Sequence, residues 1–321
     1  MSLPSHPLPI ATRRSPLAMA QALDVQARLI VACGADRAEG EALFPILGLV
    51  STGDKIQDRT LLEAGGKGLF TKEIDEAQLE GRAGFAVHSM KDVPTHLPDG
   101  LVIGAVLERE DPADMLISSR NETRLADLPQ GVVVGTASLR RQAQLLAARP
   151  DLRVVPLRGN VQTRLAKLDA GEVYATFLAK AGLKRLGHEL SARPALERSE
   201  MLPAAAQGAI GVAIRQGDDT AQTLLEALNH SASEIAIEAE RAFLDRLDGS
   251  CRTPIAANVH IESMDFRGEV LTPDGEMTWR EDMRFDVKTA NLASAREAGF
   301  ELAQRIRDRA GDALKPIVGP A

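Results

Sequence analysis

The chain has 321 residues, of which 44% are hydrophobic, 26% charged and 3% aromatic, and its formal net charge is -7 at pH 7. These figures are typical of a soluble globular protein of two or three domains and exclude the disordered and fibrous classes. No apolar stretch approaches the roughly 18 residues of a membrane helix, the start of the chain lacks the features of a secretory signal, and two cysteines cannot form a disulfide framework, so we expect a cytoplasmic protein without a membrane partner.

Strand and helix signals alternate through the first two thirds of the chain. Ser15 followed by Pro16 is typical of a helix N-cap and the first helical position, and Ser138 and Asn160 are capping residues of the same kind. This alternation predicts an α/β fold with parallel sheets, whose binding groups collect in the turns after the strands. The predicted elements are, in chain order, a helix at 16–31, a strand at 44–50, a helix at 70–80, strands at 85–87 and 132–134, a helix from 139 that ends before Pro150, a strand at 154–157, a helix at 161–170 and a strand at 173–179.

The last third of the chain has a different pattern. Short strands, separated by turn residues and flanked by two amphipathic helices, predict an α+β module. Its predicted elements are a helix at 234–247, strands at 259–261, 266–271 and 277–285 with a turn at 272–275, and a helix at 292–309.

The segment 136–187 carries a net charge of +7, from ten arginines and lysines and three acids, although the whole chain is acidic. Arg140 and Arg141 stand at the start of one predicted helix, Arg158 follows a strand, and Arg164 lies one turn into the next helix. The helix dipole disfavours cations at such positions unless an anion binds there. We therefore expect an anion site, with a solvated basic face as the alternative. The negative total and the scarcity of aromatic side chains argue against nucleic acid.

Lys91 and Asp92 directly follow a predicted strand, where a parallel sheet places its binding groups. On its own this pair is typical of solvated charges. An Asp beside cationic groups in such a turn can instead stabilise a developing cation or exchange a proton with an amine. Asp92 is also spaced four residues from His88 and from His96, but Pro94 interrupts the helix that a shared metal site would need, so we predict no metal.

Two loops carry weaker signals. The glycine-rich loop 65–68 (GGKG) lacks the spacing of a phosphate-binding loop and on its own predicts a flexible turn. Cys251 lies in the loop 249–254 (GSCRTP) beside Arg252, a placement that permits a partly exposed, reactive thiol, with an inert buried thiol as the alternative. Cys33 is interpreted as structural.

Several stretches resemble the porphobilinogen deaminase family, whose members are also called hydroxymethylbilane synthases. The stretches follow the family's order from residue 10 to about residue 257, and the rest of the chain matches only in general character. They are 10–18 (IATRRSPLA), 65–70 (GGKGLF), 86–94 (AVHSMKDVP), 108–112 (EREDP), 135–142 (GTASLRRQ), 157–160 (LRGN), 181–187 (AGLKRLG), 207–209 (QGA) and the cysteine loop.

The resemblance implies a transferase that joins four porphobilinogen molecules head to tail into the linear tetrapyrrole hydroxymethylbilane, releasing four ammonia, in haem and porphyrin biosynthesis. It implies a dipyrromethane cofactor attached by a thioether to Cys251. It also implies that Asp92 is catalytic, assisting loss of the amino group and stabilising the pyrrole-methylene cation. The family's cofactor- and substrate-binding positions fall on Arg13, Ser15, Lys67, Phe70, Ser89, Lys91, Thr136, Ser138, Arg140, Arg141, Arg158, Arg164, Arg185 and Gln207.

The fold implied by the resemblance has two α/β lobes like those of periplasmic binding proteins, with a cleft between them, and a small α+β domain. We expect the first lobe, with the catalytic aspartate, to comprise 1–110 and 203–228. The second lobe, rich in arginine, should comprise 111–202, and the domain with the cofactor-bearing cysteine should comprise 229–321. Members of the family lead us to expect a monomer.

The chain departs from the family at three positions. Tyr174 stands where the family usually has an acid, and Ala206 and Ser250 stand where it usually has glycine. A side chain directly before the thiol reduces the backbone freedom of the cysteine loop. A non-catalytic anion receptor with the same two lobes is the main alternative, but it gives Cys251 no task. A nucleic-acid binder is the third interpretation.

Overall fold

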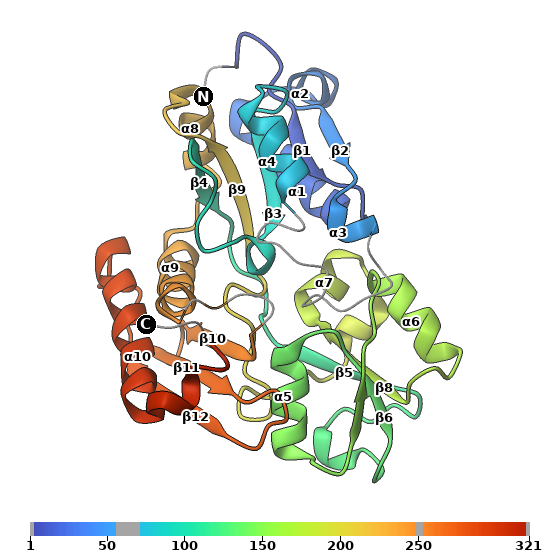
Figure 1. The fold of residues 1–321 in the computed structure, drawn as a ribbon. Coiled ribbons are helices and arrows are strands. Elements are labelled where there is room, and N and C mark those ends of the chain that lie inside the picture. The colour runs from blue at the N-terminus through green and yellow to red at the C-terminus, as the bar shows by residue number, and fades with distance from the viewer. Residues whose placement is uncertain (1–2, 56–70, 248, 250–252, 319–321) are drawn as a thin grey trace. The chain divides into compact units, whose positions relative to one another are not determined.

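The computed structural model describes residues 3–55, 71–247, 249 and 253–318, which fall into two compact units (Figure 1). The first unit contains the described residues up to 109 together with 209–234. The second contains 110–208 and the described residues from 235 onward. The division into three domains stays a prediction, because 111–202 and 235–318 lie in the same compact unit although each has a sheet of its own.

The first unit is built around a five-stranded sheet in the order β2-β1-β3-β9-β4. In this sheet β1, β2 and β3 are parallel, and β9 runs antiparallel to β3 and β4. The strands are β1 (Ile10–Arg13), β2 (Ile46–Leu49), β3 (Phe85–Ser89), β4 (Leu101–Val106) and β9 (Ile210–Arg215). The helices are α1 (Pro16–Cys33), α2 (Arg37–Leu43), α3 (Thr52–Lys55), α4 (Lys72–Leu79), the 3-10 turn η1 (Met90–Asp92) and α8 (Asp219–Glu226).

The two faces of this sheet carry different side chains, because successive residues of a strand point to opposite sides. Phe85 and Val87 of β3 belong to a large apolar cluster that includes residues of α1 and α8. Ala86 belongs instead to a smaller cluster with Ile74 of α4. The alternation continues to the end of the strand, so His88 lies on the α4 face and Ser89 on the α1 face.

The second unit contains a four-stranded sheet in the order β5-β8-β6-β7, in which β6, β7 and β8 are parallel and β5 is antiparallel to β8. Its strands are β5 (Asp114–Ser118), β6 (Val133–Gly135), β7 (Arg153–Val155) and β8 (Ala175–Ala179). Its helices are η2 (Leu125–Asp127), α5 (Leu139–Ala148), α6 (Val161–Asp169), α7 (Lys180–Arg185) and η3 (Glu189–Ala192). Because α5, α6 and α7 each follow one of the parallel strands, all three begin at the carboxyl edge of the sheet.

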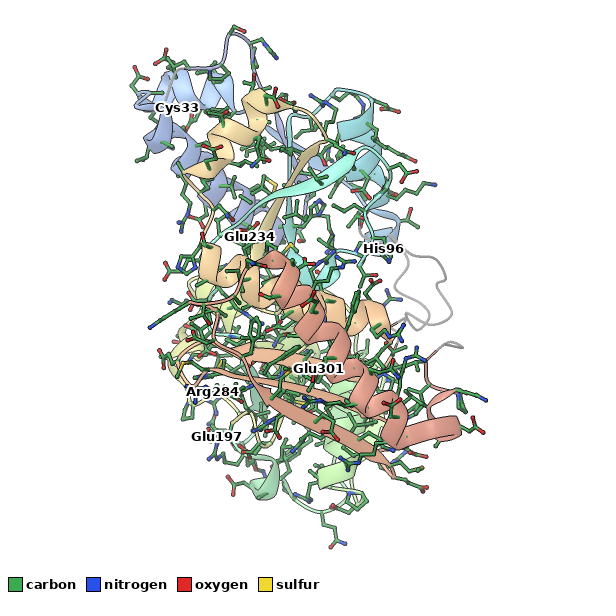
Figure 2. The ribbon with its side chains drawn as sticks, turned by 90° about the vertical axis from the view of Figure 1, so that its left-hand side faces the viewer. Cys33, His96, Glu197, Glu234, Arg284 and Glu301 are labelled. Atoms are coloured by element: carbon green, nitrogen blue, oxygen red, sulfur yellow. The ribbon has the colours of Figure 1, made fainter. Side chains whose placement is uncertain are left out.

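The rest of the second unit is an antiparallel sheet with helices, as the sequence predicts. Figure 2 shows α10 lying along the sheet, and Gly299 lets it approach α9 closely, since a Cβ there would lie 2.3 Å from the carbonyl oxygen of Ala239. The elements are α9 (Ser231–Arg246), whose first four residues belong to the first unit, β10 (Ile255–His260), β11 (Asp265–Leu271), β12 (Thr278–Arg284), α10 (Leu292–Ala310) and η4 (Gly311–Leu314).

The predicted α/β class with a small α+β part is confirmed. Every helix and strand predicted above has a counterpart within a few residues, although Phe70 and the 65–68 loop lie outside the described residues. Among the helices and strands, sequence reasoning missed α2, β1, α3, β4, β5, α7, α8 and β9. Within the described ranges no single helix is long and apolar enough to cross a membrane; α1 and α2 pass such a test only together, with a bend of 115° between them.

Candidate active site

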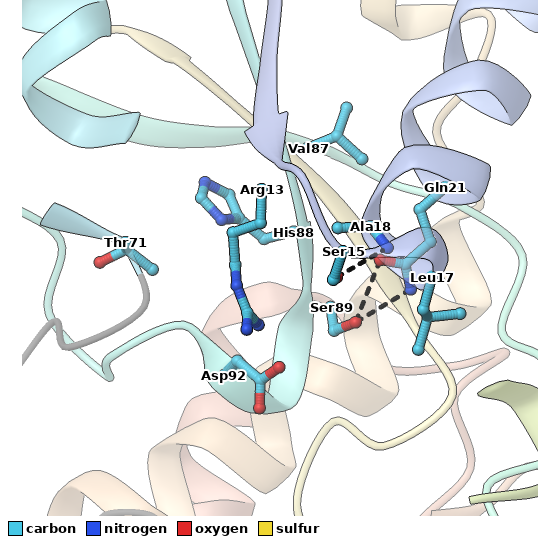
Figure 3. Close-up of a pocket in the computed structure, with 10 residues that line it drawn as sticks. All are labelled: Arg13, Ser15, Leu17, Ala18, Gln21, Thr71, Val87, His88, Ser89 and Asp92. Atoms are coloured by element: carbon cyan, nitrogen blue, oxygen red, sulfur yellow. Dashed lines mark hydrogen bonds between the residues drawn. The ribbon is translucent and has the colours of Figure 1, made fainter. Parts of the chain in front are cut away.

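The first unit has a pocket at the carboxyl ends of β1 and β3 (Figure 3). Its volume is about 60 Å³, several times what a single water molecule needs. Its lining includes both predicted catalytic and predicted binding residues, which come from different parts of the chain. The lining residues are Arg13, Ser15, Leu17, Ala18, Gln21, Thr71, Val87, His88, Ser89 and Asp92.

Arg13 and Ser15 reach the pocket because β1 ends and α1 begins there. Ser15 is the N-cap of α1, and its Oγ accepts a hydrogen bond from the backbone N–H of Ala18 at 3.4 Å. Pro16 occupies the first helical position, as its fixed φ favours. Figure 3 shows the guanidinium of Arg13, a half-buried side chain, pointing toward the carboxylate of Asp92.

Ser89 is held by a residue that sequence reasoning missed. The side-chain amide of Gln21, on α1, donates to Ser89 Oγ at 2.9 Å, and its carbonyl oxygen lies 3.1 Å from the same hydroxyl (Figure 3). Gln21 is buried and lines the pocket. A buried glutamine needs polar partners, but its burial is visible only in the structure, so no signal in the sequence identified it.

The position of Asp92 depends on the packing of Met90, two residues earlier in the same turn. The Met90 side chain is buried against Gly211 of β9, where a Cβ would lie only 2.1 Å from Met90 Sδ. The backbone N–H of Met90 donates to the carbonyl of Ala209 at 3.0 Å, and that of Val93 donates to the carbonyl of Met90 at 3.2 Å. This anchored turn, η1, presents the half-buried Asp92 to the pocket. Lys91, also half-buried, lies in the same turn.

His88 lines the same pocket as a neutral side chain. Burial and the nearby Arg13 guanidinium lower the pKa of His88 to about 4. Its Nε2 is buried without a hydrogen-bond partner among the described residues. The part of the chain that the structure describes contains no cluster of three or more potential metal ligands, and His96 is exposed (Figure 2).

In the second unit, three of the predicted binding residues converge on one buried carboxylate. Asp114, fully buried, lies 2.7 Å from Arg140 Nη1 and 2.6 Å from Arg141 Nη2. The side-chain amide of Gln207 donates to the same carboxylate at 3.0 Å. Burial opposes ionisation, but the two guanidinium groups outweigh it and hold the pKa of Asp114 well below its usual range.

The other predicted residues of this unit lie at the carboxyl edge of the sheet. The hydroxyl of Ser138 caps α5 by accepting from Arg141 N–H at 3.4 Å, and the hydroxyl of Thr136 accepts from Ser138 N–H at 3.1 Å. Arg164 Nε donates to the carbonyl of Gly159 at 2.9 Å. The turns that precede α5 and α6 thus carry polar capping side chains, helix N-termini and arginines, and free N–H groups and arginines at such positions favour bound anions.

Arg158 and Arg185 complete the predicted set in this unit. Both side chains are half-buried. Arg185 Nη2 donates to the carbonyl of Gly208 at 2.7 Å, and Lys167 Nζ lies 3.5 Å from the carbonyl of Arg158. Lys67, Phe70 and Cys251 lie outside the described residues.

The net charge of +7 counted along 136–187 is larger than the positive charge available to a ligand at the carboxyl edge of this sheet. Three acids just before the segment pair with four of its cations: Asp114 with the two arginines of α5, Asp111 with Lys180 at 2.7 Å and Glu110 with Lys184 at 2.7 Å. These acids reach the cations because β5 runs antiparallel to β8, so the start of β5 lies where the parallel strands end. A count along the chain cannot include such partners.

Two of the three departures from the family lie in described residues. The Tyr174 hydroxyl donates to Glu122 Oε1 at 2.5 Å, which raises the pKa of Tyr174, and the ring packs against an apolar cluster of the sheet. Ala206 has a φ of 61°, in the left-handed region that favours glycine. Ser250 lies outside the described residues.

The sequence matches two family models: "Porphobilinogen deaminase, dipyromethane cofactor binding domain" over residues 8–223 and "Porphobilinogen deaminase, C-terminal domain" over residues 235–308. Among curated relatives, the porphobilinogen deaminase of Paracoccus denitrificans is 48% identical over 309 residues, covering 96% of each chain. That of Nitrobacter hamburgensis is 49% identical over 305 residues, covering 94% of this chain and 93% of the relative. A chloroplastic one from Oryza sativa is 49% identical over 300 residues, covering 91% and 82%.

The chain also has structural similarity to solved structures of low sequence identity. A periplasmic VFT2 domain of BvgS from Bordetella pertussis has a TM-score of 0.40 and 15% identity, covering 70% of this chain and 86% of that one. A Salmonella typhimurium periplasmic binding protein, described as having high arginine specificity, has a TM-score of 0.41 and 13% identity, covering 70% and 92%.

Proposed function

Since this chain belongs to the porphobilinogen deaminase family, we propose that Asp92 is the catalytic carboxylate of its hydroxymethylbilane synthase reaction. The enzyme joins porphobilinogen units head to tail in tetrapyrrole biosynthesis. The observation that carries the assignment of Asp92 is the pocket of Figure 3, where its carboxylate lies with Arg13, Ser15 and Ser89 at the ends of two parallel strands. A carboxylate, a guanidinium and hydroxyls together suit a substrate with both cationic and anionic groups.

The reaction needs a group that stabilises positive charge at the pyrrole. In each addition the bond between the aminomethyl carbon and its protonated nitrogen breaks, and ammonia leaves. The methylene carbon then forms a bond to the free α-carbon of another pyrrole, whose displaced proton is taken up by the ammonia. Between the two events the substrate carries a delocalised cation. We propose that Asp92 stabilises this cation and that Arg13 and Ser15 bind substrate carboxylates.

The residues of the chain fit the dipyrromethane cofactor of the family. That group supplies the pyrrole to which substrate units are added. Its carboxylates need cations and backbone N–H groups, which the carboxyl edge of the second unit's sheet provides at the starts of α5 and α6. We propose that Cys251 holds it through a thioether, that Ser89 and Lys91 contact it, and that Lys67 and Phe70 contribute to binding. Arg158, Arg164, Arg185 and the residues around Asp114 would bind carboxylates.

Further proposals concern the setting of the enzyme. A formal net charge of -7 and an aromatic content of 3% support a protein without a nucleic-acid partner, and the low cysteine content supports a cytoplasmic location. We propose a monomer without a membrane partner. Light scattering of the purified protein tests the monomer, and a mass twice that of the chain would contradict it.

The test of the proposed function compares Asp92→Asn with a matched control, Asp99→Asn. Asp99 is an exposed aspartate in the same segment between β3 and β4. We expect Asp92→Asn to lower turnover of porphobilinogen by about 100-fold or more, the scale of a lost charge-stabilising group, and Asp99→Asn to leave it unchanged. Normal turnover in Asp92→Asn would exclude it as the catalytic residue.

Intact mass separates this enzyme from an anion receptor. The purified chain should carry the added mass of a covalent dipyrromethane, and Cys251→Ser should lose it. A receptor would show the bare chain in both proteins.

A further inference from the structure

Asp114 is a buried carboxylate that no prediction from the sequence includes. It is the first residue of β5 and pairs with Ala179, the last residue of β8. It therefore lies at the carboxyl edge of the sheet, beside the start of α5. None of its surface is exposed, and each of its oxygens lies within 2.7 Å of a different guanidinium.

The two guanidinium groups are also fixed from their other sides. Arg140 Nη1 donates to the carbonyl of Leu202 at 2.8 Å, and Arg141 Nη1 donates to the carbonyl of Phe177 at 2.8 Å. Arg141 Nε provides a second hydrogen bond to Asp114, at 3.2 Å. Both arginines are at least 95% buried. Removing the Asp114 carboxylate would thus take away the one contact that the two guanidinium groups share.

The charges in this cluster do not balance. Two guanidinium groups face one carboxylate, which leaves one unit of positive charge beside the start of a helix, where the helix dipole already disfavours cations. Glu269 also attracts Arg140, but its carboxylate is paired with Arg280 at 2.6 Å. The Nε of Arg140 is buried without a hydrogen-bond partner within the described part of the chain. The excess positive charge and the unpaired Nε–H of Arg140 both favour the binding of one further anion at this cluster.

We propose that Asp114 is a positioning residue that holds Arg140 and Arg141 ready to bind one carboxylate of the growing pyrrole chain. By neutralising one of the two charges, it makes the pair a site for a single carboxylate and reduces the repulsion between the arginines before that carboxylate arrives. This inference rests on the proposed function, because it takes the ligand to be the carboxylate-bearing pyrroles of that reaction.

The test is a double-mutant cycle of D114N, R140Q and the double variant. Asp265→Asn, which breaks the ion pair with Arg198 elsewhere in the second unit, is the control for lost stability. For each protein we would measure the fraction that carries covalent cofactor by intact mass, KM for porphobilinogen, turnover per cofactor-loaded molecule and the unfolding temperature. Asparagine has the shape of aspartate, so D114N changes charge with little change in packing.

We expect D114N to raise KM about 10-fold or more and to reduce the loaded fraction, with turnover per loaded molecule within about 3-fold of wild type. In the double variant the rise in KM should be smaller than the product of the two single effects, because Asp114 acts in part through Arg140. Asp265→Asn should lower the unfolding temperature without changing KM.

If D114N had an unchanged KM and a lower unfolding temperature, Asp114 would be purely structural and the inference would be wrong. The inference would also be wrong if the rise in KM of the double variant equalled the product of the rises in D114N and R140Q. If D114N does not fold, Gln207→Leu removes a hydrogen bond to Asp114 and keeps every charge; an unchanged KM and loaded fraction there would also overturn it. A wild-type protein that does not consume porphobilinogen would refute the proposed function instead.

Discussion

Replacing Ala206 by glycine should stabilise the protein. Ala206 has a φ of 61°, and its backbone N–H donates to the fully buried carboxylate of Glu240 at 2.6 Å. The same carboxylate accepts from the N–H of Val259 at 2.7 Å, so it ties α9 both to the segment before β9 and to β10. Because Glu240 is fixed by these contacts, the backbone at 206 keeps its left-handed conformation despite the cost of the alanine Cβ.

The size of the effect follows from two opposing terms. The left-handed conformation costs an L-residue about 1–2 kcal/mol relative to the right-handed one, and glycine does not have this cost. Glycine gives the unfolded chain more conformational freedom, which costs about 0.5–1 kcal/mol on folding. The free energy of unfolding should therefore rise by about 0.5–1 kcal/mol in Ala206→Gly, which for a chain of this size raises the unfolding temperature by about 1–4 °C.

Thermal unfolding of Ala206→Gly and of Ala205→Gly provides the assay. Ala205 is a neighbouring buried alanine whose φ is not positive, so glycine there should lower the unfolding temperature. Opposite signs at adjacent alanines would be the signature of backbone strain. A lower unfolding temperature in both variants would refute the reasoning, because the left-handed conformation would then carry no measurable cost at 206.

Three more predictions follow from single contacts. The pKa of His88 is about 4 in the folded protein and 6.5 in the unfolded chain, so the unfolded chain binds the proton first as the pH is lowered. The free energy of unfolding should therefore fall by about 3 kcal/mol between pH 6.5 and pH 4. Urea unfolding should show this loss in the wild-type protein and not in His88→Gln. Gly211→Ala should displace Met90 and with it Asp92, lowering turnover roughly 10-fold or more in a steady-state assay, and normal turnover would contradict this account of the turn. Tyr174→Phe should lower the unfolding temperature slightly and leave turnover unchanged, because its hydroxyl pairs with Glu122, which is not among the candidate site residues. A loss of turnover would give this position a role in the site.

The sequence predicted best those elements that begin and end with distinctive residues. Pro16 at the first helical position and Ser138 and Asn160 as N-caps each act within a few residues of their own position, and all three appear as expected. The missed strands β4 and β9 are apolar runs of six residues, which periodicity alone does not distinguish from a buried helical segment, and they form because they pair with each other in the sheet. Long-range pairing of this kind leaves no local pattern.

The candidate site divides in the same way. Arg13, Ser15, Ser89 and Asp92 follow from motifs at strand ends, and the structure brings them to one pocket. The residues that hold such groups in place were not found. Gln21, Asp114 and Glu240 are polar residues with hydrogen-bond partners 18 or more residues away in the chain, so neither spacing nor composition could identify them.

The basic segment shows why charge counted along a sequence is a poor measure of charge at a site. The stretch 110–135 has two arginines and five acids, and the sheet order places its first acids against the cations that follow. The start of α5 therefore carries not a pair of free arginines but a partly neutralised cluster with one positive charge in excess. On the proposal above, such a cluster would be neutralised by one carboxylate. A binding surface for a chain of pyrroles would then consist of separate single-carboxylate positions at successive turns of the sheet edge, rather than one continuous basic surface.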